Sequence, residues 1–149
     1  MIDLPRPFTA IGVVHSPFKR PEDIPVEMNA DPHGFDAVAG EIEIFPEFEA
    51  GLKDIDGFSH LIVVFAFHSA GEPRLLVRPP FETGVRGVFA TRSPHRPNPV
   101  GLTVVKLLGR TGAILRVSGL DMIEGTPVLD LKPYTVKDQK PDIATGWIK

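Results

Sequence analysis

The chain has 149 residues, of which 42% are hydrophobic and 23% charged, with a net charge of −3; this is the mixture of one ordinary globular domain rather than of a disordered tail. It contains no cysteine, which excludes disulfide frameworks, thiolate metal sites and cysteine nucleophiles. The 16 prolines and 14 glycines exclude a helical bundle, because each proline removes a backbone donor and fixes φ.

Many short extended segments predict strands. They cover, in chain order, residues 10–15, 40–45, 60–67, 75–78, 87–91, 102–108, 113–118 and 128–131. In GEIEIF (40–45) isoleucine alternates with glutamate, which is the period of a half-buried strand. HLIVVFAF (60–67) is almost continuously apolar, which predicts a central strand buried on both faces. PEFEAGL (46–52) predicts one or two helical turns, and GRTG (109–112) predicts a hairpin connection.

Short strands with tight turns and little helix predict an all-β fold, either a barrel or a sandwich. Closure into a barrel also hides the edge strands. Residues 17–39 form a long connection without clear periodicity, which is typical of a functional or mobile loop. The segment after Tyr134 is polar and broken by proline, and we expect Trp147 to dock back on the body of the protein. No domain boundary is visible, so residues 1–149 are expected to form a single domain.

Neither a membrane span nor a secretory signal is predicted. No apolar run approaches the roughly 20 residues of a membrane helix. The start MIDLPRPF lacks the basic and apolar regions of a signal peptide. We therefore expect a cytoplasmic protein with no membrane partner.

The net charge hides an asymmetry between the two halves. Residues 1–73 hold 13 acids and 4 bases (−9), and residues 74–149 hold 6 acids and 12 bases (+6), which sum to −3. From Arg74 to Arg116, seven arginines and one lysine accompany a single acid, Glu82. Arginine suits bidentate phosphate contacts and stacking on bases, so a nucleic acid is one interpretation. The other is that the basic half simply neutralises the acidic one.

Several common catalytic signatures are absent. The chain has neither G-x-G-x-x-G nor G-x-x-x-x-G-K-[ST], so a Rossmann fold and a P-loop are not supported. His60 and His68 are about 26 Å apart on an extended run, too far to share a metal, and no metal site is expected. No G-x-S-x-G elbow exists, and Ser93 and His95, two residues apart, do not by themselves make a triad.

The stretch VFATRSPHRPNPVG (88–101) places Arg92, His95 and Arg96 among three prolines. Prolines lower the entropy of the unbound loop, so its polar groups are held in place before a ligand arrives. Such a loop suits a carboxylate, a phosphate or a purine edge. The structural alternative is a rigid surface corner between strands.

The stretch GLDMIEGTPVLDLKPY (119–134) holds a turn at Gly125-Thr126-Pro127 between Asp121 and Asp130. Gly125 suits a positive φ and lets a ligand approach the backbone. Asp130 and Lys132 lie on one strand face and are expected to pair. The alternative is a hairpin with a surface ion pair worth under about 1 kcal/mol.

These two stretches resemble signature segments of the TsaA-like (YaeB/TrmO) family, in TRSPHRPNPVG (91–101) and EGTPVLDLKPY (124–134). IGVVHSPF (11–18), GLKDIDGFSHL (51–61) and FAFH (65–68) resemble it in the same order. The resemblance implies a small β-barrel methyltransferase that uses S-adenosyl-L-methionine. It implies tRNA as the substrate, methylated on N6 of threonylcarbamoyladenosine next to the anticodon, and a homodimer with the cofactor near the subunit interface. Larger bacterial members carry a C-terminal extension that is not expected here.

The resemblance also implies roles for single residues. Glu27 and Met28 stand where the family often has a glutamine near the cofactor. The other implied cofactor-binding residues are His68, Ser69, Arg92, Leu102, Leu120, Asp121, Gly125 and Thr126. Motif positions near the substrate are Arg86, Arg96, Lys132 and Tyr134.

Methyl transfer from a sulfonium to an exocyclic amine needs no metal, because the sulfonium is already a good leaving group. The enzyme must align donor and acceptor, exclude water and accept a proton. Asp121 and Asp130 are the candidate catalytic carboxylates. An anticodon-loop base is already unpaired, so extruding it costs little. Two alternatives remain open: a barrel that binds the cofactor or RNA without turnover, and a methyltransferase with a small-molecule substrate.

Overall fold

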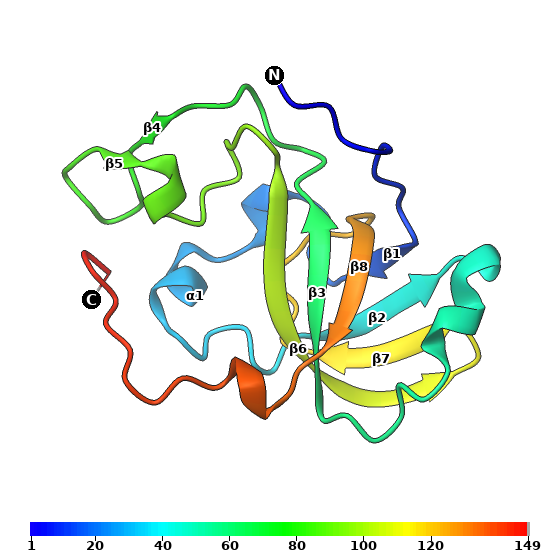
Figure 1. The fold of residues 1–149 in the computed structure, drawn as a ribbon. Coiled ribbons are helices and arrows are strands. Elements are labelled where there is room, and N and C mark those ends of the chain that lie inside the picture. Colours follow the sequence, from blue (N-terminus) through cyan, green and yellow to red (C-terminus); the bar gives the residue numbers. More distant parts are fainter. Residues whose placement is uncertain (149) are drawn as a thin grey trace.

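A computed structural model describes residues 1–148. Six strands close into a barrel in the order β1-β2-β7-β6-β3-β8, and each neighbouring pair is antiparallel (Figure 1). These strands are Gly12–His15 (β1), Ala39–Ile44 (β2), His60–Ala66 (β3), Val100–Thr111 (β6), Ile114–Ser118 (β7) and Pro127–Pro133 (β8). The predicted all-β barrel is therefore confirmed.

The remaining elements are short. Leu76–Val77 (β4) and Arg86–Gly87 (β5) form a separate two-stranded sheet. The helices are α1 (Val26–Ala30) and the 3-10 segments η1 (Pro21–Asp23), η2 (Pro46–Leu52), η3 (Val88–Ala90) and η4 (Val136–Asp138). Among residues 1–148, none of these helices combines the length and the hydrophobicity that a membrane span requires.

The core fills the barrel with the inward side chains of every strand. On β3, Leu61, Val63 and Phe65 are at most 5% exposed, while the alternate side chains are half-buried. The prediction of a strand buried on both faces is wrong, because a barrel strand has one face inside and one outside. Each fully buried aliphatic side chain contributes about 1.5–3 kcal/mol relative to exposure.

Local structure differs from the prediction at two places. Residues 87–91 are not a strand: η3 follows β5, and the Thr91 hydroxyl donates to the Val88 carbonyl at 2.8 Å. This local hydrogen bond competes with an extended conformation. The segment 119–126 is not a hairpin turn, because β7 pairs with β2 and β6 whereas β8 pairs with β1 and β3.

The strand directions sort the connections between the two ends of the barrel. Because all neighbours are antiparallel, residues 16–38, 67–99 and 119–126 emerge together where β3 finishes and β6 begins. We call this the arm end, and we call residues 67–99, which include β4 and β5, the arm (Figure 1). The opposite end, which we call the η2 end, holds η2 and the tight β6–β7 turn.

A charged cluster ties three segments together at the arm end. His15, at the end of β1, hydrogen-bonds Glu124 Oε2 through Nδ1 (2.8 Å) and Glu43 Oε1 through Nε2 (3.1 Å). Glu124 also accepts from the Ser16 amide at 2.9 Å, and Lys19 Nζ lies 3.7 Å from it. The hydrogen bond to Glu124, then that to Glu43, raises the pKa of His15, and the same His15 contact lowers the pKa of Glu124. The protonated imidazole therefore links β1, β2 and the 119–126 turn.

This cluster predicts a pH-dependent contribution to stability. The raised pKa of His15 gives stability that is fully present below its ordinary value of 6.5 and is lost as pH rises through the folded-state pKa. The lowered pKa of Glu124 gives stability present above 4.5 and lost in acid. In urea unfolding, the free energy of unfolding of wild type should exceed that of His15→Asn, and this difference should be larger at pH 6 than at pH 8.5. His33→Asn is the control, since His33 and its partner Asp36 are 82% and 70% exposed and contribute little. A constant difference across this range would contradict the prediction.

Gly101 predicts a second stability effect. A Cβ at this position would lie 2.5 Å from Cζ of Phe65 and 2.8 Å from Cζ of Phe67, whose rings form an edge-to-face pair. Phe65 is 5% exposed and belongs to the packed core, so its ring cannot move out into solvent. Gly101→Ala should therefore lower the free energy of unfolding by about 1–3 kcal/mol, measured by urea titration. At Gly51 a Cβ meets nothing within 4 Å, so Gly51→Ala should change stability by less than about 0.5 kcal/mol. Equal effects of the two substitutions would exclude overpacking at Gly101.

Candidate functional site

The structure brings every predicted cofactor-binding residue to the arm end of the barrel. These residues lie on the connections that emerge there or at the start of β6. They are Glu27, Met28, His68, Ser69, Arg92, Leu102, Leu120, Asp121, Gly125 and Thr126. Their common location was not imposed by the motifs themselves, which are scattered over about two thirds of the chain.

The first half of β6 has one open edge beside these residues. Val100 to Lys106 pair with β3 along one side, but pairing with β7 begins only at Lys106. The segment after β7 runs near the open edge, and a Cβ on Gly119 would lie 3.5 Å from the Val104 carbonyl oxygen. The open edge therefore borders the 119–126 turn instead of another strand.

Asp121 is the charged group at this edge. The Thr103 hydroxyl, on the inward side of β6, donates to Asp121 Oδ1 at 2.6 Å. Burial raises the pKa of Asp121, while the Thr103 hydrogen bond and the positive charge of Arg92 oppose that rise. Arg92 is exposed and makes no ion pair within residues 1–148. The site thus holds a half-buried carboxylate with an unpaired guanidinium in its electrostatic range.

The loop that carries Arg92 is held by its own polar groups. The Ser93 amide donates to Thr91 Oγ1 at 3.2 Å, and the His95 amide donates to Ser93 Oγ at 3.2 Å. Arg96 donates through Nη1 to the Thr91 and Ser93 carbonyls at 2.8 and 3.2 Å. Arg96, predicted near the substrate, therefore uses its guanidinium to brace the loop. Arg92, four residues earlier in the chain, takes no part in these hydrogen bonds.

His68 and Ser69 are placed next to this loop by two backbone hydrogen bonds. The Phe67 amide donates to the Pro99 carbonyl at 2.8 Å, and the Arg74 amide donates to the His95 carbonyl at 3.0 Å. His68 and Ser69 lie exposed between these two bonds. The ring atom Nδ1 of His95 is buried and has no hydrogen-bond partner among the described residues. A buried polar atom without a partner is uncommon in folded proteins.

The 119–126 turn contributes mainly backbone to the site. Leu120 is fully buried, and Thr126 is 2% exposed with its hydroxyl donating to the Ile123 carbonyl at 2.7 Å. Gly125 has φ +83 and lies exposed, a conformation that favours glycine. The side chains of Leu120 and Thr126 thus fix the turn, while Gly125 exposes its backbone.

Segment 16–38 closes the arm end from the other side. The Glu124 amide donates to the Phe18 carbonyl at 2.7 Å, and the Leu120 amide donates to the Val38 carbonyl at 3.2 Å. Between these two anchors lies α1, with Met28 half-buried and Glu27 exposed. Figure 1 shows α1 on the side of β6 that faces away from β3.

Asp130, Lys132 and Tyr134 lie apart from this cluster. Asp130 and Lys132 are on the outer face of β8 and form the expected ion pair, with Nζ–Oδ2 at 2.8 Å. Strand register places Asp130 level with Val64 of β3 and Leu102 of β6, so about 10 Å of outer face separates Asp130 from Leu102. Tyr134 stacks at a tilt against His60, with ring centroids 6.0 Å apart, near the η2 end.

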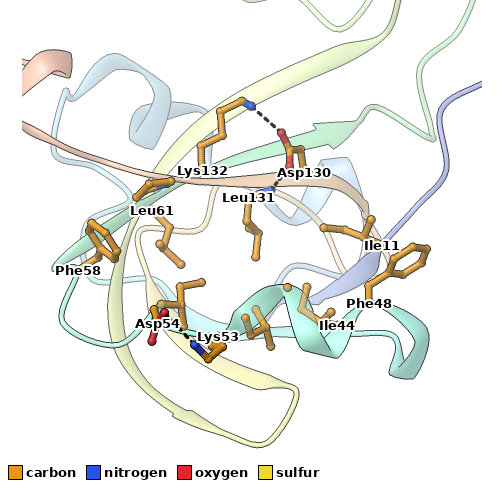
Figure 2. A pocket seen from close by; sticks show the side chains of 14 residues that line it. Ile11, Ile44, Phe48, Lys53, Asp54, Phe58, Leu61, Asp130, Leu131 and Lys132 are labelled. Carbon is orange, nitrogen blue, oxygen red and sulfur yellow. Dashed lines mark hydrogen bonds and ion pairs between the residues drawn. The ribbon is translucent and has the colours of Figure 1, made fainter. Parts of the chain in front are cut away.

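An apolar cavity of about 460 Å³ opens at the η2 end, far along the barrel from these loops. Its walls include Ile11, Ile44, Phe48, Leu61 and Leu131. In Figure 2, Leu131 points into the cavity while Asp130 and Lys132 point away from it. The cavity has no converging polar side chains, and no metal-ligand cluster of three or more His, Cys, Asp or Glu occurs within residues 1–148.

Two polar features escaped prediction from the sequence. Thr103 is polar at an inward position of β6, and this break in the alternation was readable in LTVVK. The His15–Glu124 pair had no readable signal, because the two residues are 109 positions apart. Arg86, predicted near the substrate, instead lies with Cζ 5.0 Å from the ring centroid of Trp147, so the predicted docking of Trp147 is confirmed.

Comparison with known proteins agrees with this arrangement. Residues 13–139 match the family described as tRNA-methyltransferase O N-terminal domain. A probable S-adenosyl-L-methionine-binding protein of Pyrococcus abyssi is 46% identical over 143 residues, which cover 95% of this chain and 76% of that protein. The human tRNA (adenine(37)-N6)-methyltransferase is 46% identical over 101 residues, 66% of this chain and 23% of that protein.

A solved structure shows the same fold. The crystal structure of TrmO from Pseudomonas aeruginosa has a TM-score of 0.77 and 33% identity, and the match covers 98% of this chain. The chain spans 64% of that TrmO chain. With a family match over most of its length and the same barrel, this chain belongs to the family of the tRNA-methyltransferase O N-terminal domain.

Proposed function

We propose that this chain is an S-adenosyl-L-methionine-dependent methyltransferase that acts on tRNA, at N6 of an adenosine. The single observation that carries the proposal is the juxtaposition of Asp121, held by Thr103, with Arg92 at the open edge of β6. The names of the relatives, S-adenosyl-L-methionine-binding protein and tRNA (adenine(37)-N6)-methyltransferase, support the cofactor and the substrate class. The proposed target is threonylcarbamoyladenosine next to the anticodon.

The residues present fit this cofactor. It carries a carboxylate, an ammonium, a sulfonium and a ribose with an adenine, so it needs both an anionic and a cationic partner. Arg92, unpaired on its braced loop, suits the carboxylate, and Asp121 suits a cationic group or a ribose hydroxyl. The Nδ1 atom of His95 and the carbonyl of Gly125, whose amide already donates to the Val14 carbonyl at 2.9 Å, are proposed as further polar partners. His68 and Ser69 border the same space, and Leu102 offers an apolar contact.

The chemistry assigns Asp121 more than a binding role. When bound, the cofactor would supply a methyl group attached to a positively charged sulfur. The leaving group would be the neutral thioether that contains this sulfur. Asp121 stabilises positive charge beside it, and its raised pKa makes the carboxylate a better proton acceptor near neutral pH. Asp130 is a weaker candidate, because Lys132 already holds its carboxylate on the outer face.

The arm is the proposed contact for RNA. Besides Arg92, which is assigned to the cofactor, Arg74 and Arg78 are exposed along it, whereas Arg110 donates to the Leu52 carbonyl at the η2 end. These two further guanidinium groups suit phosphates of an anticodon loop. Lys132 and Tyr134 lie farther along β8 and are proposed only as outer contacts of the same substrate.

We also propose that the protein is a cytoplasmic homodimer. The arm exposes large apolar side chains, at 52–76% of their surface, in a chain segment that has few acids. They are Leu75, Leu76, Phe81, Val85 and Phe89. Leu102 and Val104 add exposed apolar surface on the outer face of β6. Monomeric proteins rarely leave such patches open, and a second copy on this face would border the cofactor site at Leu102.

A transfer assay tests the reaction and the substrate together. The protein is incubated with labelled S-adenosyl-L-methionine and with tRNA that bears or lacks the threonylcarbamoyl group. Label should enter only the modified tRNA. Cofactor binding without transfer would instead favour a binding protein, and transfer to a small molecule but not to tRNA would exclude the RNA substrate.

Two substitutions test whether Arg92 and Asp121 belong to the cofactor site. Arg92→Ala should lower cofactor affinity by at least tenfold, because a charge-assisted bidentate contact is lost, and Asp121→Asn should lower the transfer rate by about 10²–10⁴-fold, the usual contribution of a general base. Isothermal titration and single-turnover rates measure these effects. Lys106→Ala is the control, since Lys106 is an exposed residue of β6 whose side chain makes no hydrogen bond or ion pair within residues 1–148. Full activity of Asp121→Asn would remove Asp121 from the mechanism.

The proposed dimer predicts that a charge on the outer face of β6 will shift the protein from dimer toward monomer. Val104→Glu puts a charge on the exposed outer face of β6, so the dissociation constant of the dimer should rise by at least tenfold, as measured by analytical ultracentrifugation. Leu108→Glu is the matched control, because Leu108 is 52% exposed on the part of β6 that lies beyond β3. A monomeric wild type, or equal behaviour of the two variants, would refute this interface.

A further inference from the structure

The arm has little internal structure to hold Arg92 in place. The β4–β5 sheet has only two residue pairs, Leu76 with Gly87 and Val77 with Arg86. Among the hydrophobic side chains of the arm beyond Phe67, only Val77 and Val88 are buried. A lone two-stranded hairpin is marginally stable in water. Positioning of the Arg92 loop therefore needs contacts from outside the arm.

The C-terminal segment supplies such a contact. In Figure 1 this segment, in red, runs from the end of β8 past α1 toward the green arm. Its Trp147 donates through Nε1 to the carbonyl of Ala90 at 2.8 Å, across 57 positions of sequence. Ala90 ends η3, and Thr91 and Arg92 follow directly. The hydrogen bond therefore acts on the turn that sets the direction of Arg92.

Arg86 completes the contact from the arm side. Its Cζ lies 5.0 Å from the ring centroid of Trp147, within cation–π range. Its Nη2 lies 3.8 Å from Glu82 Oε2, and its Nε is buried without a hydrogen-bond partner in the described chain. We call Arg86, Ala90 and Trp147 the clamp. In the clamp, Arg86 of β5 lies over the face of the Trp147 ring, and Ala90 of η3 accepts a hydrogen bond from the ring edge. Both β5 and η3 are thereby joined to the C-terminal segment.

We propose that Trp147 is a positioning residue for Arg92 and that the clamp preorganises the cofactor site; this rests on the proposed function. The indole N–H fixes the last carbonyl of η3, and the Thr91 hydroxyl fixes the first, at Val88. With both in place, the Arg92 loop meets its ligand already ordered. Without the clamp, part of the binding free energy is spent on ordering the loop, so affinity falls while the chemistry of the bound complex is unchanged.

Limited trypsin digestion tests the clamp without any activity. Trypsin cuts after arginine but not before proline, so Arg92–Ser93 is a susceptible bond while Arg96–Pro97 is not. Trp147→Ala removes both clamp contacts, and Trp147→Phe keeps a ring for Arg86 but loses the N–H donor. Cleavage at Arg92–Ser93 should speed up by about tenfold in the first variant and by less in the second, because cleavage follows the population of the opened loop. Ile143→Ala, a 72% exposed residue of the same segment, should behave as wild type.

Steady-state kinetics and titration then test positioning. For Trp147→Ala the dissociation constant and KM for S-adenosyl-L-methionine should rise about five- to tenfold with kcat nearly unchanged, and Trp147→Phe should recover part of the loss. A fall in kcat alone, or wild-type cleavage and affinity in both variants, would overturn the proposal. Should Trp147→Ala fold poorly, the milder Trp147→Phe decides by the same criteria.

One measurement separates this proposal from the proposed function. Trp147 is the only tryptophan, so its fluorescence reports the clamp directly. In Arg92→Ala the emission should stay at the wild-type wavelength while cofactor binding is lost, because Arg92 is not part of the clamp. Should wild type bind no S-adenosyl-L-methionine, the proposed function fails, whereas a change in trypsin cleavage would still show that the clamp orders the loop.

Discussion

Closure of the barrel is the constraint on which the site depends. β1 and β8 close it through only two register pairs, Gly12 with Val128 and Val13 with Pro127. Because every neighbour is antiparallel, closure forces residues 16–38, 67–99 and 119–126 to emerge at one end. Segments that are distant in sequence thereby meet at the arm end. The packed core inside the barrel supplies the rigidity, and the loops at the arm end supply the polar groups.

Charges at the arm end divide into two kinds. Those that hold the fold are paired: the His15 imidazole lies between Glu43 and Glu124, which also accepts from the Ser16 amide. The charges of the candidate site are not paired with each other: Asp121 accepts from the Thr103 hydroxyl and from its own backbone amide, and Arg92 lies close enough to influence its pKa but forms no ion pair with it in the described chain. A half-buried carboxylate without a paired cation costs stability. Its position near a free guanidinium is what the proposed site for a zwitterionic ligand requires.

Features that depend on neighbouring residues could be predicted from the sequence, whereas contacts between residues far apart in the chain could not. Strict alternation in GEIEIF predicted β2, and the prolines of residues 88–101 predicted a rigid loop, although the hydrogen bonds of Arg96 to the loop backbone were not predicted. The strand predicted at residues 87–91 was wrong because both the amide and the hydroxyl of Thr91 donate to the Val88 carbonyl, which turns the chain into η3. The family motifs named Asp121, but its partner Thr103 follows from barrel geometry, which places an inward side chain of β6 against the 119–126 turn. The predicted site residues also include Leu120 and Thr126, whose side chains are buried and stabilise the 119–126 turn.

The arm carries two proposed contacts, one with a second copy of the chain and one with the cofactor, and both involve the same loop. Its exposed apolar side chains, such as Phe81 and Phe89, are the surface proposed for a second copy, and Arg92 is the proposed cofactor contact. With a two-pair sheet and little buried surface, the arm belongs to the least stable part of the fold. Any contact that orders η3, from Trp147 within the chain or from a partner subunit on Phe89, therefore shifts the same local equilibrium. In the proposed dimer, dimerisation and cofactor binding would be thermodynamically linked, and each would strengthen the other by the same factor.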